Sequence, residues 1–233
     1  GYSKDKKVCF SEKIQLKNVS FRYSSNSPLI LKNINLEIKY GECIGIVGET
    51  GSGKSTLLDL LIGLLNPTKG ELIIDSQKIT KNSDLLKGWQ KKISHVPQDI
   101  YLADIPIAEN IAFGIPQKDI DMQKVKKAAS RACISELIEN LENGYGNLIG
   151  ERGIRLSGGQ RQRLGIARAL YREPEVLIFD EGTSALDKST EMAVMQSIYK
   201  LKQQITIIIV AHRLSTISKC NRIIRVENGN LKF

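Results

Sequence analysis

Eight consecutive residues combine three glycines with a lysine and a hydroxyl group, in an order that suits phosphate binding. They are Gly48, Glu49, Thr50, Gly51, Ser52, Gly53, Lys54 and Ser55, with Thr56 next in the chain. Glycines let the backbone curl so that successive N–H groups converge on phosphate oxygens, and a helix that begins here adds partial positive charge. Lys54 can reach the β- and γ-phosphates and the Ser55 hydroxyl can ligate Mg²⁺, so we predict a site for ATP with Mg²⁺. The competing interpretation is a plain glycine turn between a strand and a helix.

Two adjacent acids, Asp180 and Glu181, follow the apolar segment Val176–Phe179. Neighbouring side chains on a strand point apart, so the two carboxylates must have different roles. We predict that Asp180 holds Mg²⁺ and that Glu181 is the general base toward the attacking water. A solvated acidic turn is the competing interpretation, which the phosphate-binding loop upstream disfavours.

A third motif, Leu156–Gln160, stands before a helical stretch rich in arginine. Ser157 can cap that helix, and its hydroxyl together with the bare amides of Gly158 and Gly159 at the helix N-terminus offers a second place for an anion. Two phosphate-binding helix ends in one chain suggest that ATP is held between two surfaces.

The apolar pattern predicts the elements that position these motifs. Residues 14–40 alternate, as half-buried antiparallel strands do, whereas Cys43–Val47 is continuously apolar, as a strand buried on both faces should be. We expect a helix from Lys54 that is ended by Asn66-Pro67, and then a strand over Glu71–Asp75.

From about Pro106 to Leu170 the strand pattern gives way to helical spacing, which predicts an inserted helical subdomain. Apolar strands over Glu175–Asp180 and Thr206–Ala211, with a helix between them at 187–202, indicate a parallel βαβ unit, and a hairpin is expected near Asn228–Asn230. The predicted fold class is α/β: a P-loop NTPase core with a mostly parallel sheet, an N-terminal antiparallel β subdomain and an inserted α-helical signature subdomain. We predict one domain over residues 1–233.

Composition narrows the class of protein further. The 233 residues carry a net charge of +9 and four widely spaced cysteines, which argues against zinc ligation and a disulfide framework and fits a reducing cytosol. The strongly apolar run Ile205–Ala211 is too short to cross a bilayer, and a start without Met suggests a domain excised from a longer chain. Solvated helix faces are the favoured interpretation of the Lys and Arg clusters; anionic lipid or nucleotide contact is second. Nucleic acid is third, because no aromatics are interleaved with the basic residues.

The order of these motifs resembles the nucleotide-binding domains of ABC transporters over essentially the whole chain. The residues that carry the resemblance are the loop 48–55, Gln98, Leu156–Gln160, Asp180-Glu181, Ser184–Asp187 and His212. In that family two cassettes pair head to tail, and each ATP lies between the P-loop of one and the LSGGQ of the other. The resemblance therefore implies a homodimer in which Ser157–Gln160 act on the partner's nucleotide and Ser184–Asp187 form the D-loop that crosses the pair.

The same resemblance implies roles for three isolated residues. Tyr23 would stack on adenine, Gln98 would touch Mg²⁺ and the lytic water, and His212 would contact the γ-phosphate; with Lys54 and Glu181, Gln98 and His212 would form the catalytic set. Packing for Tyr23, a turn for Gln98 and a satisfied core histidine for His212 are the competing interpretations.

Two further segments resemble exporter cassettes more than importer cassettes. They are Glu151-Arg152-Gly153 and Ala211–Thr216, whereas Gly182 and Pro106 depart from the usual exporter pattern. The expected function is ATP hydrolysis that powers an exporter of lipid, glycolipid, drug or peptide. It would act with a transmembrane domain of the same parent polypeptide, at the cytoplasmic face of the inner membrane, and the isolated domain would be soluble. Two rivals are a soluble ABC ATPase acting on nucleic acid or ribosomes, and a non-hydrolysing assembly module.

Overall fold

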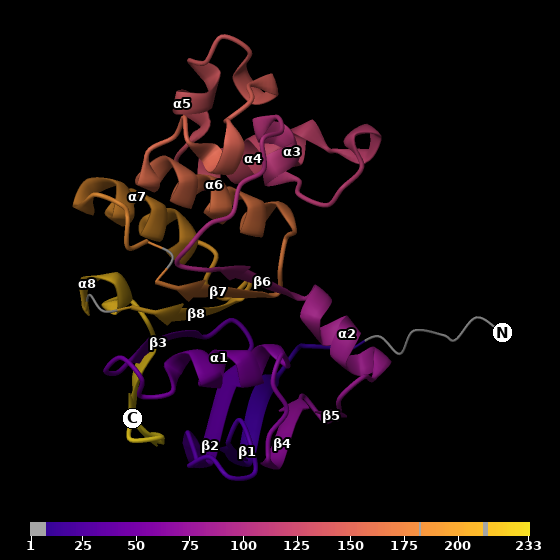
Figure 1. Ribbon diagram of the computed structural model, residues 1–233, viewed down its shortest axis with the longest axis vertical. Coiled ribbons are helices and arrows are strands. Elements are labelled where there is room, and N and C mark those ends of the chain that lie inside the picture. Colours follow the sequence, from indigo (N-terminus) through magenta and orange to yellow (C-terminus); the bar gives the residue numbers. More distant parts are fainter. Residues whose placement is uncertain (1–7, 182, 212–213) are drawn as a thin grey trace, which may run out of the picture. The chain divides into compact units, whose positions relative to one another are not determined.

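The computed structural model describes residues 8–181, 183–211 and 214–233 (Figure 1). It divides into two compact units, Gly1–Ile93 with Lys202–Phe233, and Ser94–Leu201. We call the first the P-loop unit, because it contains residues 48–55, and the second the signature unit, because it contains Leu156–Gln160.

The P-loop unit contains a four-stranded antiparallel sheet in the order β2-β1-β4-β5. Its strands are β1 (Lys13–Phe21), β2 (Leu31–Lys39), β4 (Lys69–Ile74) and β5 (Gln77–Ile79). Ile14 of β1 stands opposite both Ile38 and Ile74, so apolar side chains gather on one face of the sheet. The predicted antiparallel strands over residues 14–40 are thereby confirmed.

A second set of strands in this unit has the order β10-β9-β3-β8. Strand β3 (Cys43–Val47) runs parallel to β8 (Thr206–Val210) and to β9 (Arg222–Glu227), and β10 (Asn230–Lys232) closes the expected hairpin with β9. The first four residues of β3 are fully buried, as its unbroken apolar sequence predicts.

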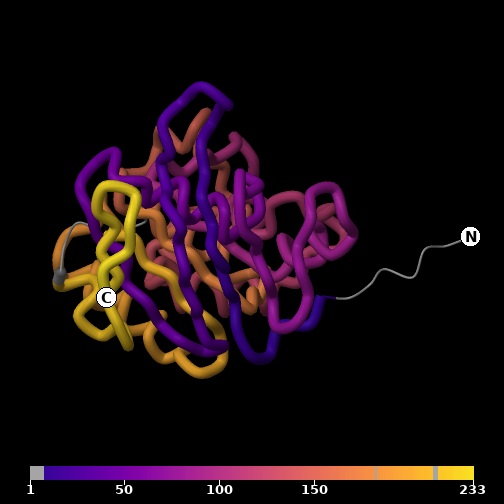
Figure 2. Tube along the Cα trace, turned by 90° about the horizontal axis from the view of Figure 1, so that it is seen from below, coloured from indigo at the N-terminus to yellow at the C-terminus, as the bar shows by residue number. Residues whose placement is uncertain are grey.

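The hairpin turn lies beside the start of β2, where the Lys32 amide donates to the Gly229 carbonyl at 2.8 Å (Figure 2). At the start of β3, Cys43 Sγ lies 3.4 Å from Cys220 Sγ. This hydrogen bond, together with burial, raises the pKa of the Cys43 thiol, which is therefore neutral.

The described residues of the P-loop unit form helices α1 (Lys54–Ile62), α2 (Asp84–Lys91) and α8 (Leu214–Ile217). Helix α1 begins at Lys54 as predicted, but it ends at Gly63 rather than at Asn66-Pro67, so that prediction was wrong. Gly63 adopts a left-handed conformation (φ 77°), which closes the helix four residues before the proline. The Trp89 indole on α2 donates to the Leu61 carbonyl at 2.8 Å and so joins α2 to the end of α1.

The signature unit is mainly helical. Strands β6 (Ile93–Val96) and β7 (Val176–Asp180) are neighbours, and the helices are α3 (Ile107–Ile111), α4 (Met122–Arg131), α5 (Ser135–Glu139), α6 (Gly158–Tyr171) and α7 (Lys188–Tyr199). Short 3₁₀ turns lie at η1 (Gln117–Asp119), η2 (Gly144–Gly146) and η3 (Glu151–Gly153). Residues 107–170, all described, contain no strand, and helix α6 packs against α3 and α4.

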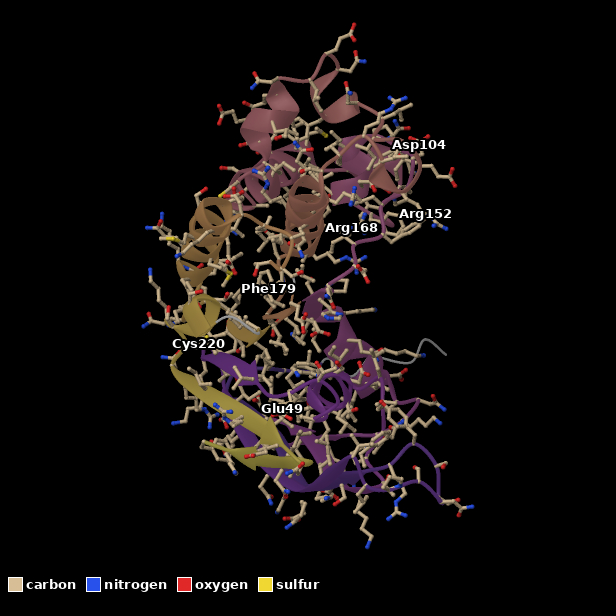
Figure 3. All side chains as sticks on the ribbon, turned by 60° about the vertical axis from the view of Figure 1, so that its left-hand side comes forward. Glu49, Asp104, Arg152, Arg168, Phe179 and Cys220 are labelled. Atoms are coloured by element: carbon tan, nitrogen blue, oxygen red, sulfur yellow. The ribbon has the colours of Figure 1, made fainter. Side chains whose placement is uncertain are left out.

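Arginines of α6 bind backbone carbonyls of the same unit rather than forming the solvated face expected from their spacing. Arg168, labelled in Figure 3, is half-buried, donates to the carbonyls of Asn110 and Tyr101 at 2.8 Å each, and lies over the Phe113 ring. Arg163 donates to the Cys133 carbonyl at 2.6 Å. These α6 guanidinium groups therefore form charge-assisted hydrogen bonds to backbone oxygens within the same unit.

Candidate active site

The loop between β3 and α1 has the backbone that a phosphate cradle requires. Gly51 (φ 79°) and Gly53 (φ 108°) are left-handed, and the Ser52 amide donates to the Glu49 carbonyl at 3.1 Å. A Cβ on Gly48 would lie 2.4 Å from the Val226 carbonyl oxygen, so a larger residue cannot fit there without displacing β9. Two features therefore demand glycine: backbone conformation at positions 51 and 53, and space at position 48.

Lys54 is buried along the loop, with 8% of its surface exposed. Its ammonium donates to the carbonyl oxygens of Gly48 and Glu49, at 2.8 Å in both cases. These bonds hold the positive charge inside the curl of the loop, beside the N-terminus of α1, which has no acidic residue in its first turn. The charge and the helix dipole together favour an anion here.

Tyr23, Ser55 and Thr56 belong to the same unit as the phosphate loop. The Tyr23 ring is 64% exposed, stands edge-on to Phe21, and its hydroxyl is 3.2 Å from the Thr56 hydroxyl. Ser55 is exposed in the first turn of α1, whereas Thr56 is buried. The predicted adenine-stacking ring is thus joined by a hydrogen bond to the helix that follows the phosphate loop.

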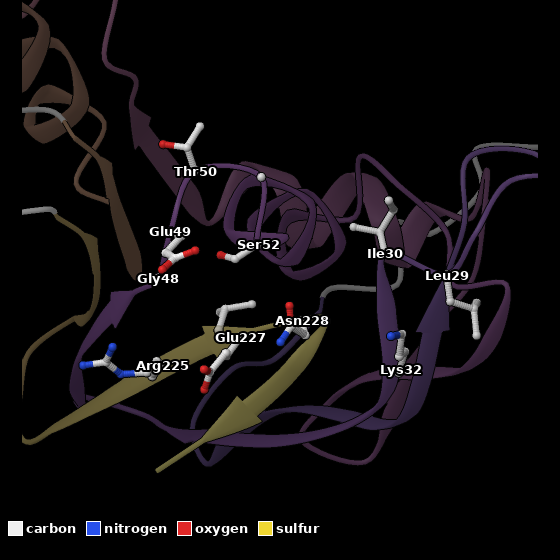
Figure 4. Close-up of a pocket in the computed structure, with 13 residues that line it drawn as sticks. Leu29, Ile30, Lys32, Gly48, Glu49, Thr50, Ser52, Arg225, Glu227 and Asn228 are labelled. Atoms are coloured by element: carbon white, nitrogen blue, oxygen red, sulfur yellow. The ribbon is translucent and has the colours of Figure 1, made fainter.

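A pocket of about 380 Å³ also lies against the loop backbone (Figure 4). Its walls come from residues 29, 30 and 32 at the start of β2, residues 48–52 of the loop and residues 225–229 of the last hairpin. Neither Lys54 nor Tyr23 lines it, which distinguishes this pocket from the predicted cradle for the phosphates.

In the signature unit, the two acids stand where β7 ends. Asp180 is the last residue of the strand and is half-buried, and Glu181 follows in a left-handed conformation with φ 54°. Such a backbone is uncommon for a residue other than glycine and is held only when its surroundings fix it. The extended course of the strand therefore ends at Glu181, and different roles for the two carboxylates remain a prediction.

The signature motif forms a closed helix cap. Ser157 Oγ accepts from the Gln160 amide at 3.2 Å, and Gln160 Oε1 accepts from the Ser157 amide at 2.9 Å, which is a capping box. Gly158 and Gly159 lie against the segment 185–186, where Cβ atoms added to them would be 3.5 Å from Ala185 Cβ and 3.3 Å from the Ala185 carbonyl oxygen. The structure therefore brings the signature glycines and the predicted D-loop together within one unit.

Gln162 is a functional candidate that the sequence analysis missed. Its side chain is 2% exposed, and its Oε1 accepts from the Ala185 amide at 2.9 Å. Its Nε2 donates to the Ser184 hydroxyl at 3.2 Å and to the Glu181 carbonyl at 3.5 Å. Its position two residues beyond the motif was the only signal available, and the arginines on either side masked it.

The remaining predicted residues have simpler surroundings. Gln98 is exposed just after β6. Asp187 is the N-cap of α7, where its Oδ1 accepts from the amides of Ser189 and Thr190 at 3.1 and 3.0 Å. His212, the predicted contact of the γ-phosphate, and Gly182 lie outside the described residues.

The predicted Mg²⁺ ligands offer suitable donor atoms. Ser55, Gln98 and Asp180 supply a hydroxyl, a carboxamide oxygen and a carboxylate, all hard oxygen donors of the kind Mg²⁺ prefers. Ser55 belongs to the P-loop unit, and Gln98 and Asp180 belong to the signature unit. The donor chemistry therefore fits the ion.

Comparison with known proteins supplies the family. The family model described as ABC transporter matches residues 31–184, which include the phosphate loop, the signature motif and the two acids at the end of β7. The chain belongs to the ABC transporter family. The resemblance inferred from the motifs is confirmed.

Relatives within this family are translocation proteins. The chain is 46% identical over 219 residues to the leukotoxin translocation ATP-binding proteins LktB of Mannheimia glucosida, Mannheimia haemolytica and Bibersteinia trehalosi, covering 94% of this chain. It spans about 30% of the length of these curated relatives.

Among solved structures, the chain is similar to a bacterial Atm1-family ABC exporter with ATP bound. The TM-score is 0.89 and the identity 35%, over 97% of this chain and 39% of that one. The predicted fold class is thereby confirmed. Within the described residues of this chain, no helix combines the length and the apolar composition needed to span a bilayer.

Proposed function

We propose that this chain is the ATP-hydrolysing domain of an exporter-type ABC transporter. The observation that carries the proposal is the cradle before α1, in which glycine-dependent backbone surrounds the buried Lys54 ammonium, 2.8 Å from two loop carbonyls. Such a loop is preorganised for the tail of a nucleoside triphosphate, because its amides, charge and helix dipole act at one place. The exporter assignment is supported by translocation relatives at 46% identity and by the fold of an ATP-bound exporter.

Each predicted residue has a task in this proposal. Lys54 and the loop amides bind the phosphates, Tyr23 orients the adenine, and Glu181 accepts a proton from water that attacks the γ-phosphate in line. Ser55 and Asp180, with Gln98, would hold Mg²⁺, which when bound neutralises charge on the phosphates. His212 would contact the γ-phosphate beside them.

The proposal includes a pair of chains. Ser157–Gln160 of one chain would complete the ATP site of the other in a head-to-tail homodimer, and closure of the pair would drive a transmembrane domain of the parent polypeptide from the cytoplasmic side. The cargo would be selected by those membrane segments. Nucleic acid is not part of the proposed function, since the α6 arginines engage carbonyl oxygens of their own unit.

Phosphate release by the parent chain and by Glu181→Gln tests the catalytic part. The amide keeps the size of the side chain but cannot accept a proton, so turnover should fall by about 10²–10⁴-fold while ATP affinity stays within about twofold. ATP should also trap the variant as a dimer on size exclusion. Parent-like phosphate release by Glu181→Gln would exclude Glu181 as the base.

A further inference from the structure

The carboxamide of Gln162 joins the signature helix to the turn that carries the acids. It reaches from α6 to Ala185 N at 2.9 Å, to Ser184 Oγ at 3.2 Å and to the Glu181 carbonyl at 3.5 Å. The orientation of the amide is fixed by chemistry, because the Ala185 N–H can only donate and the Glu181 carbonyl can only accept. Gln162 is thus a buried side chain whose donors and acceptor are all directed at one turn.

The turn that Gln162 holds needs such support. Glu181 has a left-handed backbone, a conformation that is unfavourable for a non-glycine residue and persists only when the surroundings impose it. On the other side of the turn, the buried Thr183 hydroxyl bonds to Glu191 of α7 at 2.9 Å. Glu181, Ser184 and Ala185 are therefore held from α6 through Gln162, and Thr183 is held from α7 through Glu191.

The same helix that carries Gln162 begins with the signature cap. Gln162 is only two residues beyond Gln160 on the same helix, and the signature glycines themselves lie against Ala185. A displacement of the cap is consequently transmitted to the 181–185 turn by direct contact, with no intervening loop.

We infer that Gln162 is a positioning residue that links the signature motif of a chain to the alignment of its own Glu181. This inference rests on the proposed function, in which the signature motif acts on one ATP and Glu181 on the other. Gln162 then connects the two ATP sites of the pair through a single side chain, so that nucleotide docked at one site aligns the base at the second.

The test compares Gln162→Met, which keeps the volume and removes the hydrogen bonds, with Arg172→Gln. Arg172 is the C-cap at the other end of α6 and donates to the Phe113 carbonyl at 3.3 Å, so it controls for loosening of the helix. Gln162→Met should lower kcat roughly 10- to 100-fold, as expected for a misaligned base, with the Kd for ATP unchanged. The Hill coefficient for ATP should fall toward that of independent sites, while Arg172→Gln keeps the parent kcat and Hill coefficient.

Ser184→Ala sharpens the result, because it removes one of the partners of Gln162. Its effect and that of Gln162→Met should be less than additive in the double variant if they act through the same hydrogen bond. A Gln162→Met protein with the parent kcat overturns the inference. A variant in which kcat, ATP affinity and melting temperature all fall together overturns it as well. Either of these two Gln162→Met results would remove the proposed role of Gln162. The proposed function would still stand, provided that the parent hydrolyses ATP and Glu181→Gln does not.

Discussion

The two helix N-termini implicated in ATP binding are built in opposite ways. Helix α1 has glycine at its N-cap and no side-chain cap, so the loop keeps its amides for a ligand and places Lys54 among them. Helix α6 is capped by its own motif, since Ser157 and Gln160 exchange hydrogen bonds. The P-loop is therefore preorganised to bind an anion by itself, whereas the signature motif is first a stable cap. In the proposed pair it would exchange its internal bonds for contacts to a nucleotide.

Glycine substitutions should show the difference between the two helix ends most strongly. Gly48→Ala would drive a Cβ to 2.4 Å from the Val226 carbonyl oxygen and 2.7 Å from Ser52 Oγ, which the loop cannot accommodate unchanged. ATP binding to the monomer, measured by titration calorimetry, should weaken by about 100-fold or more. Gly158→Ala meets only ordinary contact with Ala185 at 3.5 Å and should keep the parent affinity. Equal losses in the two variants would refute the distinction between the helix ends.

Ser157→Ala tests the comparison at the N-terminus of α6. The substitution removes the acceptor for the Gln160 amide and should cost about 1 kcal/mol of stability, as N-cap losses do. Chemical denaturation should show this cost, and calorimetry on the monomer should show no change in ATP affinity. Ser157→Thr retains a hydroxyl cap and should recover most of the stability. A variant with full stability would mean that the capping box contributes nothing to α6.

The smallest effect is expected at Asp187, a further cap in the signature unit. Hydrogen bonds from Ser189 and Thr190 hold its pKa well below the usual range, so the carboxylate stabilises the fold above the unfolded pKa of about 4 and this contribution is lost as pH falls. Asp187→Ala should lower the melting temperature slightly at pH 7, and Asp187→Asn should lower it by less. The difference in melting temperature between each variant and the parent should shrink below about pH 4. A difference that is constant with pH would contradict this role.

Local patterns could be predicted from the sequence, and long-range partners could not. The strand Cys43–Val47 and the start of α1 follow directly from apolar continuity and the glycine loop, because both depend on neighbouring residues. Strand β6 was missed, since Ile93–Val96 is only four residues long and mixes polar with apolar side chains. Spacing alone predicts solvation for Arg168, and only the fold brings its carbonyl partners, 58 and 67 residues away, into reach.

The residues of the candidate site show the same difference between local patterns and long-range partners. The cradle residues 48–55 could be identified because their chemistry is contiguous in the sequence. Gln162 could not be identified, because its role depends on Ser184 and Ala185, more than twenty residues further along the chain. Roles for Tyr23, Gln98, Asp187 and His212 came from the family resemblance and remain predictions.

Titration of Mg²⁺–ATP into Lys54→Ala tests the cradle most directly, with phosphate release followed on the same samples. Loss of a charged hydrogen-bonding group should weaken binding by roughly 1.5–3 kcal/mol, about 10- to 150-fold, and should suppress turnover more strongly still. Thermal unfolding of the variant at a melting temperature near that of the parent would confirm that the loop, rather than the fold, has been disturbed. A Lys54→Ala protein that binds Mg²⁺–ATP as tightly as the parent and releases phosphate at the same rate would contradict the account.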